Sequence, residues 1–202
     1  MSGGADDDLV QALREALRSW LESACPPTMV RQVEAGASPA ALWRGIEAAG
    51  FADALRAEAR GGAGLSLLQA VDLMEAEATQ ALPVPLALTA AVRAALDGLG
   101  REVPEGSITV ALGTLPPSVG GMVRNVPWGR VADWVLLVGS EGGWWLLPTA
   151  AAQCQDTGVP GSLRAHLHGL DRSQALHGAA PQPPQDWRGL AAVVLAGLMA
   201  GA

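Results

Sequence analysis

Residues 42–89 read LWRGIEAAGFADALRAEARGGAGLSLLQAVDLMEAEATQALPVPLALT, and the spacing of their apolar residues decides the fold class. The first part of this stretch predicts a helix between Ser38 and Gly50. Ser38 suits an N-cap, Pro39 suits the first helical position, and Gly50 stands where a C-cap belongs. The side expected to be buried comprises Leu42, Trp43, Ile46 and Ala49.

A second helix is predicted to begin at Ser66. Gln69 follows three residues later, and this pair is typical of a capping box. We expect the helix to end before Pro83, with Leu67, Val71, Met74 and Ala78 on its apolar face. Glu75 and Glu77 lie two residues apart and therefore point in different directions around a helix, and we expect both as surface charges.

Two further helices are predicted on either side of this stretch. Leucines at every fourth position indicate a helix from Leu9 to Leu21, which ends at Cys25–Pro27. The aspartates at positions 6–8 precede it and suit the positive end of its dipole. After Pro85, another apolar face is expected from Leu88, Ala91, Val92, Ala95 and Leu96. The first hundred residues are therefore predicted to be helical.

The pattern changes near Pro104–Gly106, after which strands are predicted. In the first of them, residues 107–112, apolar residues alternate as in a half-buried strand. Residues 140–143 (Ser-Glu-Gly-Gly) join two apolar runs and predict a hairpin. The other expected strands are 132–138, 143–147, 163–167 and 174–177. Helices followed by strands in blocks favour an α+β fold, a helical bundle followed by a small antiparallel β-barrel or sandwich, over an alternating parallel sheet.

Composition excludes several classes of function. The chain has a formal net charge of -7 and a pI of about 4.9, without the basic patch typical of nucleic-acid binders. It contains no lysine, which excludes a Walker A phosphate loop and a Schiff-base enzyme, and no tyrosine to act as an acid or nucleophile. Cys25 and Cys154 are far apart and lack metal-site spacing, and reduced thiols are the expectation. The acidic N-terminus indicates no secretion signal, and we expect a cytoplasmic protein.

The last fourteen residues, Gly189–Ala202, carry no charged or polar side chain. This segment is shorter than the roughly 20 residues that cross a bilayer, so a buried helix is favoured over a membrane anchor. A helix that is apolar all round must be buried on every side, and we expect a further helical domain or another chain to cover it. The predicted domains are 1–103 (helical), 104–186 (β) and 187–202 (the start of a truncated helical domain).

Residues 42–89 resemble the N-terminal helical domain of the acyl-CoA dehydrogenase family, which typically shows a Leu-Trp…Gly-Phe helix followed by a Gly-Gly-x-Gly-Leu-Ser turn. Residues 120–139 (GGMVRNVPWGRVADWVLLVG) resemble the middle β-domain of the same family. Pro83–Leu86 suits its bacterial branches. The turn matches at Gly61, Gly62, Gly64, Leu65 and Ser66. The resemblance implies an acyl-CoA substrate, FAD as cofactor, and a homo- or hetero-oligomer with another family subunit.

In this family the middle domain covers the flavin ring of FAD with an aromatic-Ile-Thr-Asn patch. A gapless alignment puts these four positions on Asn125, Val126, Pro127 and Trp128, so the family's side-chain contacts are lost. The resemblance still implies backbone contacts to FAD at Val126, Pro127 and Trp128, and it matches Thr114 to the threonine of an earlier flavin and CoA segment. The alternative for Trp128 is an ordinary half-buried aromatic residue beside a turn.

Dehydrogenation next to a thioester needs a carboxylate that removes the α-proton while the flavin accepts the β-hydride. The family keeps this glutamate in its C-terminal helical domain, and no acidic residue here matches it, so we assign no catalytic residue. Two functions remain open. The chain is a truncated or partner-dependent acyl-CoA dehydrogenase-like flavoprotein, or it is a non-catalytic assembly subunit or degenerate relative without bound flavin.

Two other motifs favour structural interpretations. His166 and His168 share one face of a predicted strand, but no third ligand has suitable spacing for a metal. The loop Gly61–Gly64 lacks the lysine and the preceding strand of a phosphate loop, so a turn between helices is expected.

Overall fold

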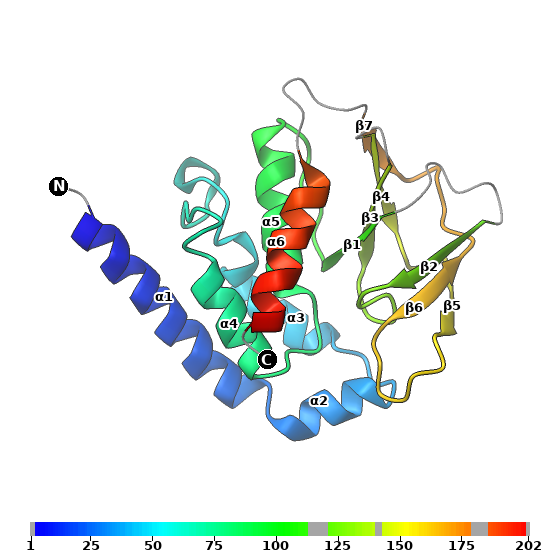
Figure 1. Ribbon diagram of the computed structural model, residues 1–202, viewed down its shortest axis with the longest axis horizontal. Helices are drawn as coiled ribbons and strands as arrows, with labels where there is room; N and C mark the ends of the chain where they lie inside the picture. Colours follow the sequence, from blue (N-terminus) through cyan, green and yellow to red (C-terminus); the bar gives the residue numbers. More distant parts are fainter. Residues whose placement is uncertain (1–2, 113–120, 140–142, 179–185, 201–202) are drawn as a thin grey trace.

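The computed structural model describes residues 3–112, 121–139, 143–178 and 186–200. Helices lie on one side of the molecule and two small sheets lie on the other, as Figure 1 shows, which confirms the α+β class. The helices are α1 (Gly3–Ala24), α2 (Pro27–Glu34), α3 (Ala40–Ala48), α4 (Val71–Thr79), α5 (Leu86–Gly98) and α6 (Trp187–Ala200), with 3-10 turns η1 (Phe51–Asp53) and η2 (Glu58–Arg60). The strands are β1 (Ile108–Leu112), β2 (Met122–Val126), β3 (Trp134–Val138), β4 (Trp144–Pro148), β5 (Gln153–Asp156), β6 (Ala165–His168) and β7 (Leu176–Gly178).

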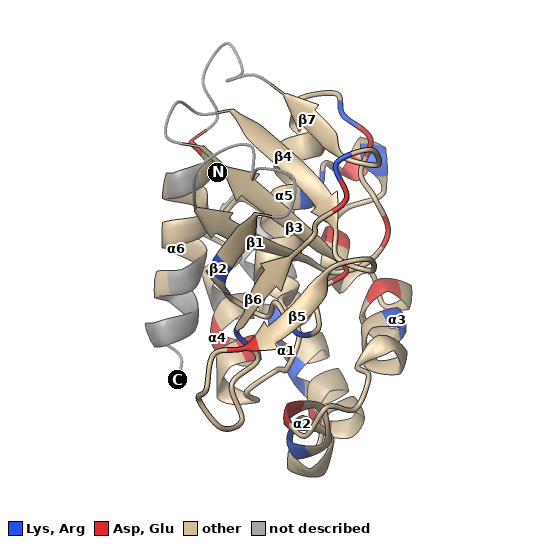
Figure 2. Ribbon diagram, turned by 90° about the vertical axis from the view of Figure 1, so that its right-hand side faces the viewer, with Lys and Arg blue, Asp and Glu red and all other residues tan. Residues whose placement is uncertain are grey.

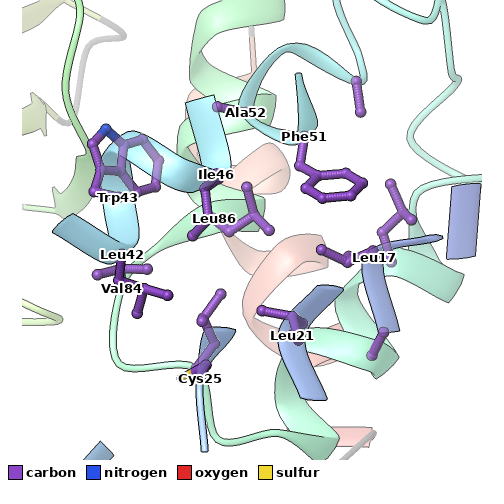
Figure 3. Packing of buried hydrophobic residues seen from close by; sticks show 14 of the residues in the cluster. Leu17, Leu21, Cys25, Leu42, Trp43, Ile46, Phe51, Ala52, Val84 and Leu86 are labelled. Carbon is purple, nitrogen blue, oxygen red and sulfur yellow. The ribbon is translucent and has the colours of Figure 1, made fainter. Parts of the chain in front are cut away.

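The N-terminal helices follow the leucine spacing. Leu17 and Leu21 of α1 are fully buried and pack with Phe51 and Leu86 in the core shown in Figure 3. The helix begins at Gly3, so the aspartates at positions 6–8 lie inside it rather than before it. Helix α2 was not predicted, although Pro27 at its first positions is a usual start signal.

Helix α3 begins one residue later than predicted, with Pro39 rather than Ser38 at its N-cap, and α4 begins at Val71, five residues after the predicted Ser66. Ser66 and Gln69 form the capping box, with the Ser66 amide donating to Gln69 Oε1 at 2.9 Å. Ala49 is exposed, although it was expected on the buried side of its helix. Val71 is 38% exposed, whereas Glu77, expected on the surface, is 2% exposed. The predicted face of α4 was right at Met74 and wrong at Val71, because the buried side is made by Leu73, Met74, Ala76 and Glu77.

The strands form a four-stranded sheet in the order β1-β3-β4-β7 and a three-stranded sheet in the order β2-β6-β5. The hairpin of β3 and β4 is antiparallel, as predicted, whereas β1 pairs with β3 in parallel. Strand β1 is not half-buried: Thr109 and Ala111 are buried as well as Ile108 and Val110, and Leu112 is exposed. Both faces of β1 are covered because the helices lie on one side of its sheet and the three-stranded sheet lies on the other.

Hydrophobic clusters fill the spaces between these layers. One cluster lies between helices α4–α6 and the four-stranded sheet and includes Met74, Ile108 and Trp187. Another lies between the two sheets and includes Val126, Val135 and Leu167. The result is a helical layer and two sheets stacked in order, which agrees with the sandwich alternative of the prediction.

Helix α6 returns to the helical side and lies against α4 and α5 (Figure 1). Its Trp187 contacts Trp144 of β4 with ring centroids 5.8 Å apart, and Ala191 and Val194 are buried. On the opposite side Ala192 and Ala196 are exposed and Val193 is 47% exposed. Among the side chains of α6 that the structure describes, one side is therefore buried within the chain and the other is exposed. Among the described residues, no helix has both the length and the apolarity to cross a membrane.

A cluster of ion pairs ties the helices to the start of the β-domain. Arg93 of α5 is buried and pairs with Glu47 of α3 and with Asp53 of η1. Its guanidinium also donates to the carbonyl of Gly106 at 3.0 Å, two residues before β1. The Glu47 carboxylate accepts the amide of Gly106 at the same point. This cluster holds the end of the helical part against the first strand.

Candidate functional site

The predicted flavin-facing segment lies at the end of β2, where the backbone leaves regular strand geometry. The register of β2 on β6 shifts between Val123 and Val126. Asn125 has a φ of 55° and Trp128 has a φ of 47°. Such left-handed conformations are strained for non-glycine residues, most of all for a bulky side chain, and they gather at functional positions. The segment between them is therefore held in one shape by its surroundings.

Hydrogen bonds within the protein use most of the polar backbone of this segment. The Asn125 amide donates to His166 Nδ1 at 3.0 Å. The carbonyl of Pro127 accepts the Thr109 hydroxyl at 2.6 Å, and the carbonyl of Trp128 accepts the amides of Val131 and Ala132. Within the described residues, we find no partner for the backbone amide of Trp128.

The side chains of the segment divide between two hydrophobic clusters. Val126 is fully buried between the sheets. Trp128 is half-buried and packs on the cluster between the helices and the four-stranded sheet. Gly129 follows, and a Cβ there would stand 3.0 Å from the Val126 carbonyl oxygen and 3.2 Å from Ala165 Cβ. A larger residue at Gly129 would thus displace the turn that carries Trp128.

These groups fit only part of a flavin-binding site. Pro127 has no amide to donate, and its carbonyl is already bonded to Thr109. Val126 offers no exposed side chain. The groups that remain for a ring lying on this segment are the Trp128 amide and the open part of its indole. Thr114, the fourth predicted binding residue, lies outside the described residues.

The other motifs singled out from the sequence have partners within the protein. His166 accepts from Asn125, and His168 lies 3.0 Å from Gln155 Oε1. The described residues contain no cluster of three metal-ligating side chains. Gly62 has no room for a Cβ, which would stand 2.1 Å from the Arg56 carbonyl oxygen, so the Gly61–Gly64 loop is a tight turn. Burial, together with Asp156, raises the pKa of the Cys154 thiol, which does not suit a nucleophile.

A groove of about 330 Å³ lies between α3 and the start of β1, and Val131, whose amide donates to the Trp128 carbonyl, is among its lining residues. Two of the carboxylates that line it are engaged, because Asp133 accepts from the amide and hydroxyl of Ser107 and Glu47 pairs with Arg93. Glu105 also lines the groove.

Sequence reasoning missed one unusual titratable group, Glu77. It is buried in a small apolar cavity under α4 and α5, and none of the residues 125–129 lines that cavity. The spacing of Glu75 and Glu77 indicated that they face opposite ways, and that was the available signal that one of them points inward.

Comparison with known proteins matches the helical half of the chain to one family model. Residues 7–102 match the family model of the acyl-CoA dehydrogenase N-terminal domain. Among curated proteins, no significant sequence match was found.

Solved structures match over almost the whole chain. A variant of the steroid ACAD Tcur3481–Tcur3483 is 22% identical with a TM-score of 0.73, covering 97% of this chain and 63% of that one. The ChsE4–ChsE5 complex from Mycobacterium tuberculosis is 20% identical with a TM-score of 0.62, covering 92% and 58%. XiaF from Streptomyces sp., solved with FADH2 and glycerol, is 16% identical with a TM-score of 0.59, covering 96% and 62%.

The chain spans about three fifths of the length of these structures. The sequence match covers the helical half, and the shared fold continues through both sheets into α6. Residues 7–102 therefore match the N-terminal domain of the acyl-CoA dehydrogenase family, which supports the resemblance seen in the sequence, and the solved structures share the fold of the rest of the chain.

Proposed function

We propose that this chain is a partner-dependent subunit of an acyl-CoA dehydrogenase-like flavin complex, in which the segment Val126–Trp128 covers a flavin held mainly by other groups. The observation that carries the proposal is the strained Trp128, whose amide has no partner among the described residues and whose side chain is only partly buried. In this complex the substrate is an acyl-CoA, and dehydrogenation takes place between its α and β carbons.

The flavin part of the proposal is supported by relatives with the same fold. One is solved with FADH2 and another, KijD3, with FMN. The segment here retains few of the contacts expected for such a ring, so this chain alone is expected to hold little FAD. The cofactor must then be bound chiefly by a second chain or by residues outside 1–202.

The partner part of the proposal is supported by the outer side of α6 and the start of α4. Large apolar side chains are exposed at Val193 on α6, at Val71, the first residue of α4, and at Leu68 in the turn before α4, and these two helices are in contact. From Gly189 onward the sequence of α6 carries no charged residue, and the described side chains of that stretch are tan in Figure 2. Exposed apolar surface of this kind marks protein contacts. Two of the similar structures are named as assemblies of two different chains.

The test is co-expression with an acyl-CoA dehydrogenase-family chain encoded beside this one, followed by purification through a tag on this chain. We expect a complex with flavin absorbance that oxidises acyl-CoA with an artificial electron acceptor, whereas the chain alone has neither property. Trp128→Ala is expected to lower flavin content and activity about tenfold while the complex still forms, since base or ring stacking on an aromatic residue contributes roughly 1–3 kcal/mol.

A second variant separates assembly from flavin contact. Val193→Glu places a charge on the exposed side of α6 and is expected to reduce recovery of the partner. Val159→Glu is the matched control, because Val159 is 64% exposed and lies on the β-domain, away from α6. A chain that is yellow and active on its own would contradict the proposal.

The same experiment distinguishes the second candidate, a non-catalytic assembly subunit. This candidate is favoured by Pro127, which has no amide and whose carbonyl is occupied by Thr109. If the complex forms and is active but Trp128→Ala leaves flavin content and activity unchanged, this chain has the assembly role.

A further inference from the structure

Glu77 lies inside the helical layer, at the junction of α4 and α5. Its Oε2 atom accepts the amide of Ala87, in the first turn of α5, at 2.9 Å. Its Oε1 atom is buried and has no hydrogen-bond partner among the described residues. The residue is 2% exposed.

The surroundings of this carboxyl are otherwise apolar. It lines a cavity of about 10 Å³, which is close to the smallest volume that holds one water molecule. Leu17, Phe51 and Leu86, which line this cavity, point into the same core in Figure 3. The remaining lining residues are Leu55, Ala70, Leu73, Met74, Ala87 and Ala90.

No described charged group neutralises Glu77 from the elements around it. On α1, Arg14 and Arg18 lie along a separate groove beside Glu75. On α5 and η1, Arg93 and Asp53 pair with each other. Burial raises the pKa of Glu77 to about 8, and hydrogen bonds from the amides of Ala87 and Leu86 oppose this increase only in part.

We propose that Glu77 is a proton-operated latch on the α4–α5 junction: its protonated carboxyl closes the junction, and loss of the proton opens it. The uncharged group needs no counter-ion, and it still accepts the Ala87 amide at the N-terminus of α5. The carboxylate would be an isolated charge in an apolar cavity, and such a charge requires water. The cavity has no room for a hydration shell, so α4 and α5 must separate to admit one.

Opening this junction affects the surface of α4 and α5 on which α6 packs. Ala70 just before α4, Met74 of α4 and Ala91 of α5 belong to the same cluster as Ala191 and Val194 of α6. Separation of α4 from α5 removes that common surface. The latch therefore couples protonation at an internal residue to the docking of the helix that carries the exposed Val193.

Hydrogen–deuterium exchange of the full chain tests the latch. Protection of residues 71–98 and 187–200 is measured at about pH 6 and about pH 9, on either side of the raised pKa, and corrected for the pH dependence of intrinsic exchange. We expect opening of these segments to increase on the order of tenfold or more at the higher pH, and protection of the two sheets to change less.

Glu77→Gln keeps the shape and the acceptor for Ala87 but cannot ionise, so its protection is expected to be the same at both pH values. Glu75→Gln, an exposed residue of the same helix, is the control and is expected to respond as the wild type does. The proposal is overturned if Glu77→Gln retains the wild-type pH response. It is also overturned if the wild type shows no response, a result that stands even if a variant fails to fold.

Discussion

The two halves of α5 each meet a buried ionisable side chain, and the protein accommodates these two groups in opposite ways. Arg93, in the C-terminal half, is 4% exposed and meets Glu47, Asp53 and the carbonyl of Gly106. Glu77, at the N-terminal end, is 2% exposed and meets only backbone amides and apolar side chains. Both are inside the core, yet only one has a counter-charge.

The difference shows how burial affects the ionisation of a side chain that has a counter-charge and of one that has none. A buried charge that is paired and hydrogen-bonded remains ionised, whereas one without a partner becomes neutral. Arg93 consequently connects three segments of the chain by charge, and Glu77 makes its own junction sensitive to pH. One half of α5 is fixed, and the other responds to protons.

The largest effect is expected from Arg93→Ala. Removing one member of a buried ion pair leaves the other charges uncompensated and costs roughly 3–5 kcal/mol. The side chains of Glu47 and Asp53 are 26% and 25% exposed, so water screens part of that cost and we expect about 3 kcal/mol. The free energy of unfolding from urea titration at neutral pH measures it.

Arg18→Ala is the control for this prediction. Arg18 pairs with Glu22 on the exposed side of α1, and such surface pairs contribute about 0.5 kcal/mol or less. If Arg93→Ala destabilises no more than Arg18→Ala, the pairing around Arg93 is not what holds this half of α5.

The next effect is a pH-dependent gain in stability from Glu77→Gln. The pKa of Glu77 is raised in the folded chain, so between about pH 4.5 and about pH 8 the folded state holds a proton that the unfolded state has released. The contribution of Glu77 to the free energy of unfolding is greatest at or below about pH 4.5. It declines as the pH rises through this window, by up to roughly 1.4 kcal/mol per pH unit.

The difference in unfolding free energy between Glu77→Gln and wild type isolates this group from the other carboxyls. We expect it to be small at about pH 5 and to favour the variant by on the order of 2 kcal/mol at neutral pH. Parallel pH profiles for the two proteins would show that Glu77 ionises in the folded chain as it does in water.

The fold was predictable where a local pattern determines the structure by itself. The leucines of α1, the Ser66–Gln69 pair and the antiparallel hairpin of β3 and β4 each depend on neighbouring residues only. The parallel pairing of β1 with β3 was not predictable from these patterns, because it depends on how the chain crosses between the two sheets.

The buried face of α4 and the shape of the candidate site could not be predicted from the sequence, because both depend on the three-dimensional arrangement of the elements. Apolar residues occur on more than one side of α4, and it is contacted by α1, α5 and α6, so its spacing did not indicate that Val71 would be exposed and Glu77 buried. The strain at Trp128 arises from the turn around Gly129 and cannot be read from residue types. The missing amide of Pro127 was visible in the sequence, but its bond to Thr109 was not.

The smallest effect is expected from Ser66→Ala. Because Ser66 is an exposed cap and Glu77 a buried one, comparing the two variants separates the effect of helix capping from the effect of burial. Ser66 and Gln69 cap the turn leading into α4, as Glu77 caps α5, but Ser66 is exposed and neither residue ionises in this range. Loss of such a cap costs about 1 kcal/mol, and water replaces the lost partner. We therefore expect the same loss in unfolding free energy at about pH 6 and about pH 8. A loss that grew with pH would mean that helix capping near this junction produces the pH response. If the loss of unfolding free energy from Ser66→Ala is the same at both pH values while the effect of Glu77→Gln changes with pH, the pH response comes from the burial of an unpaired carboxyl.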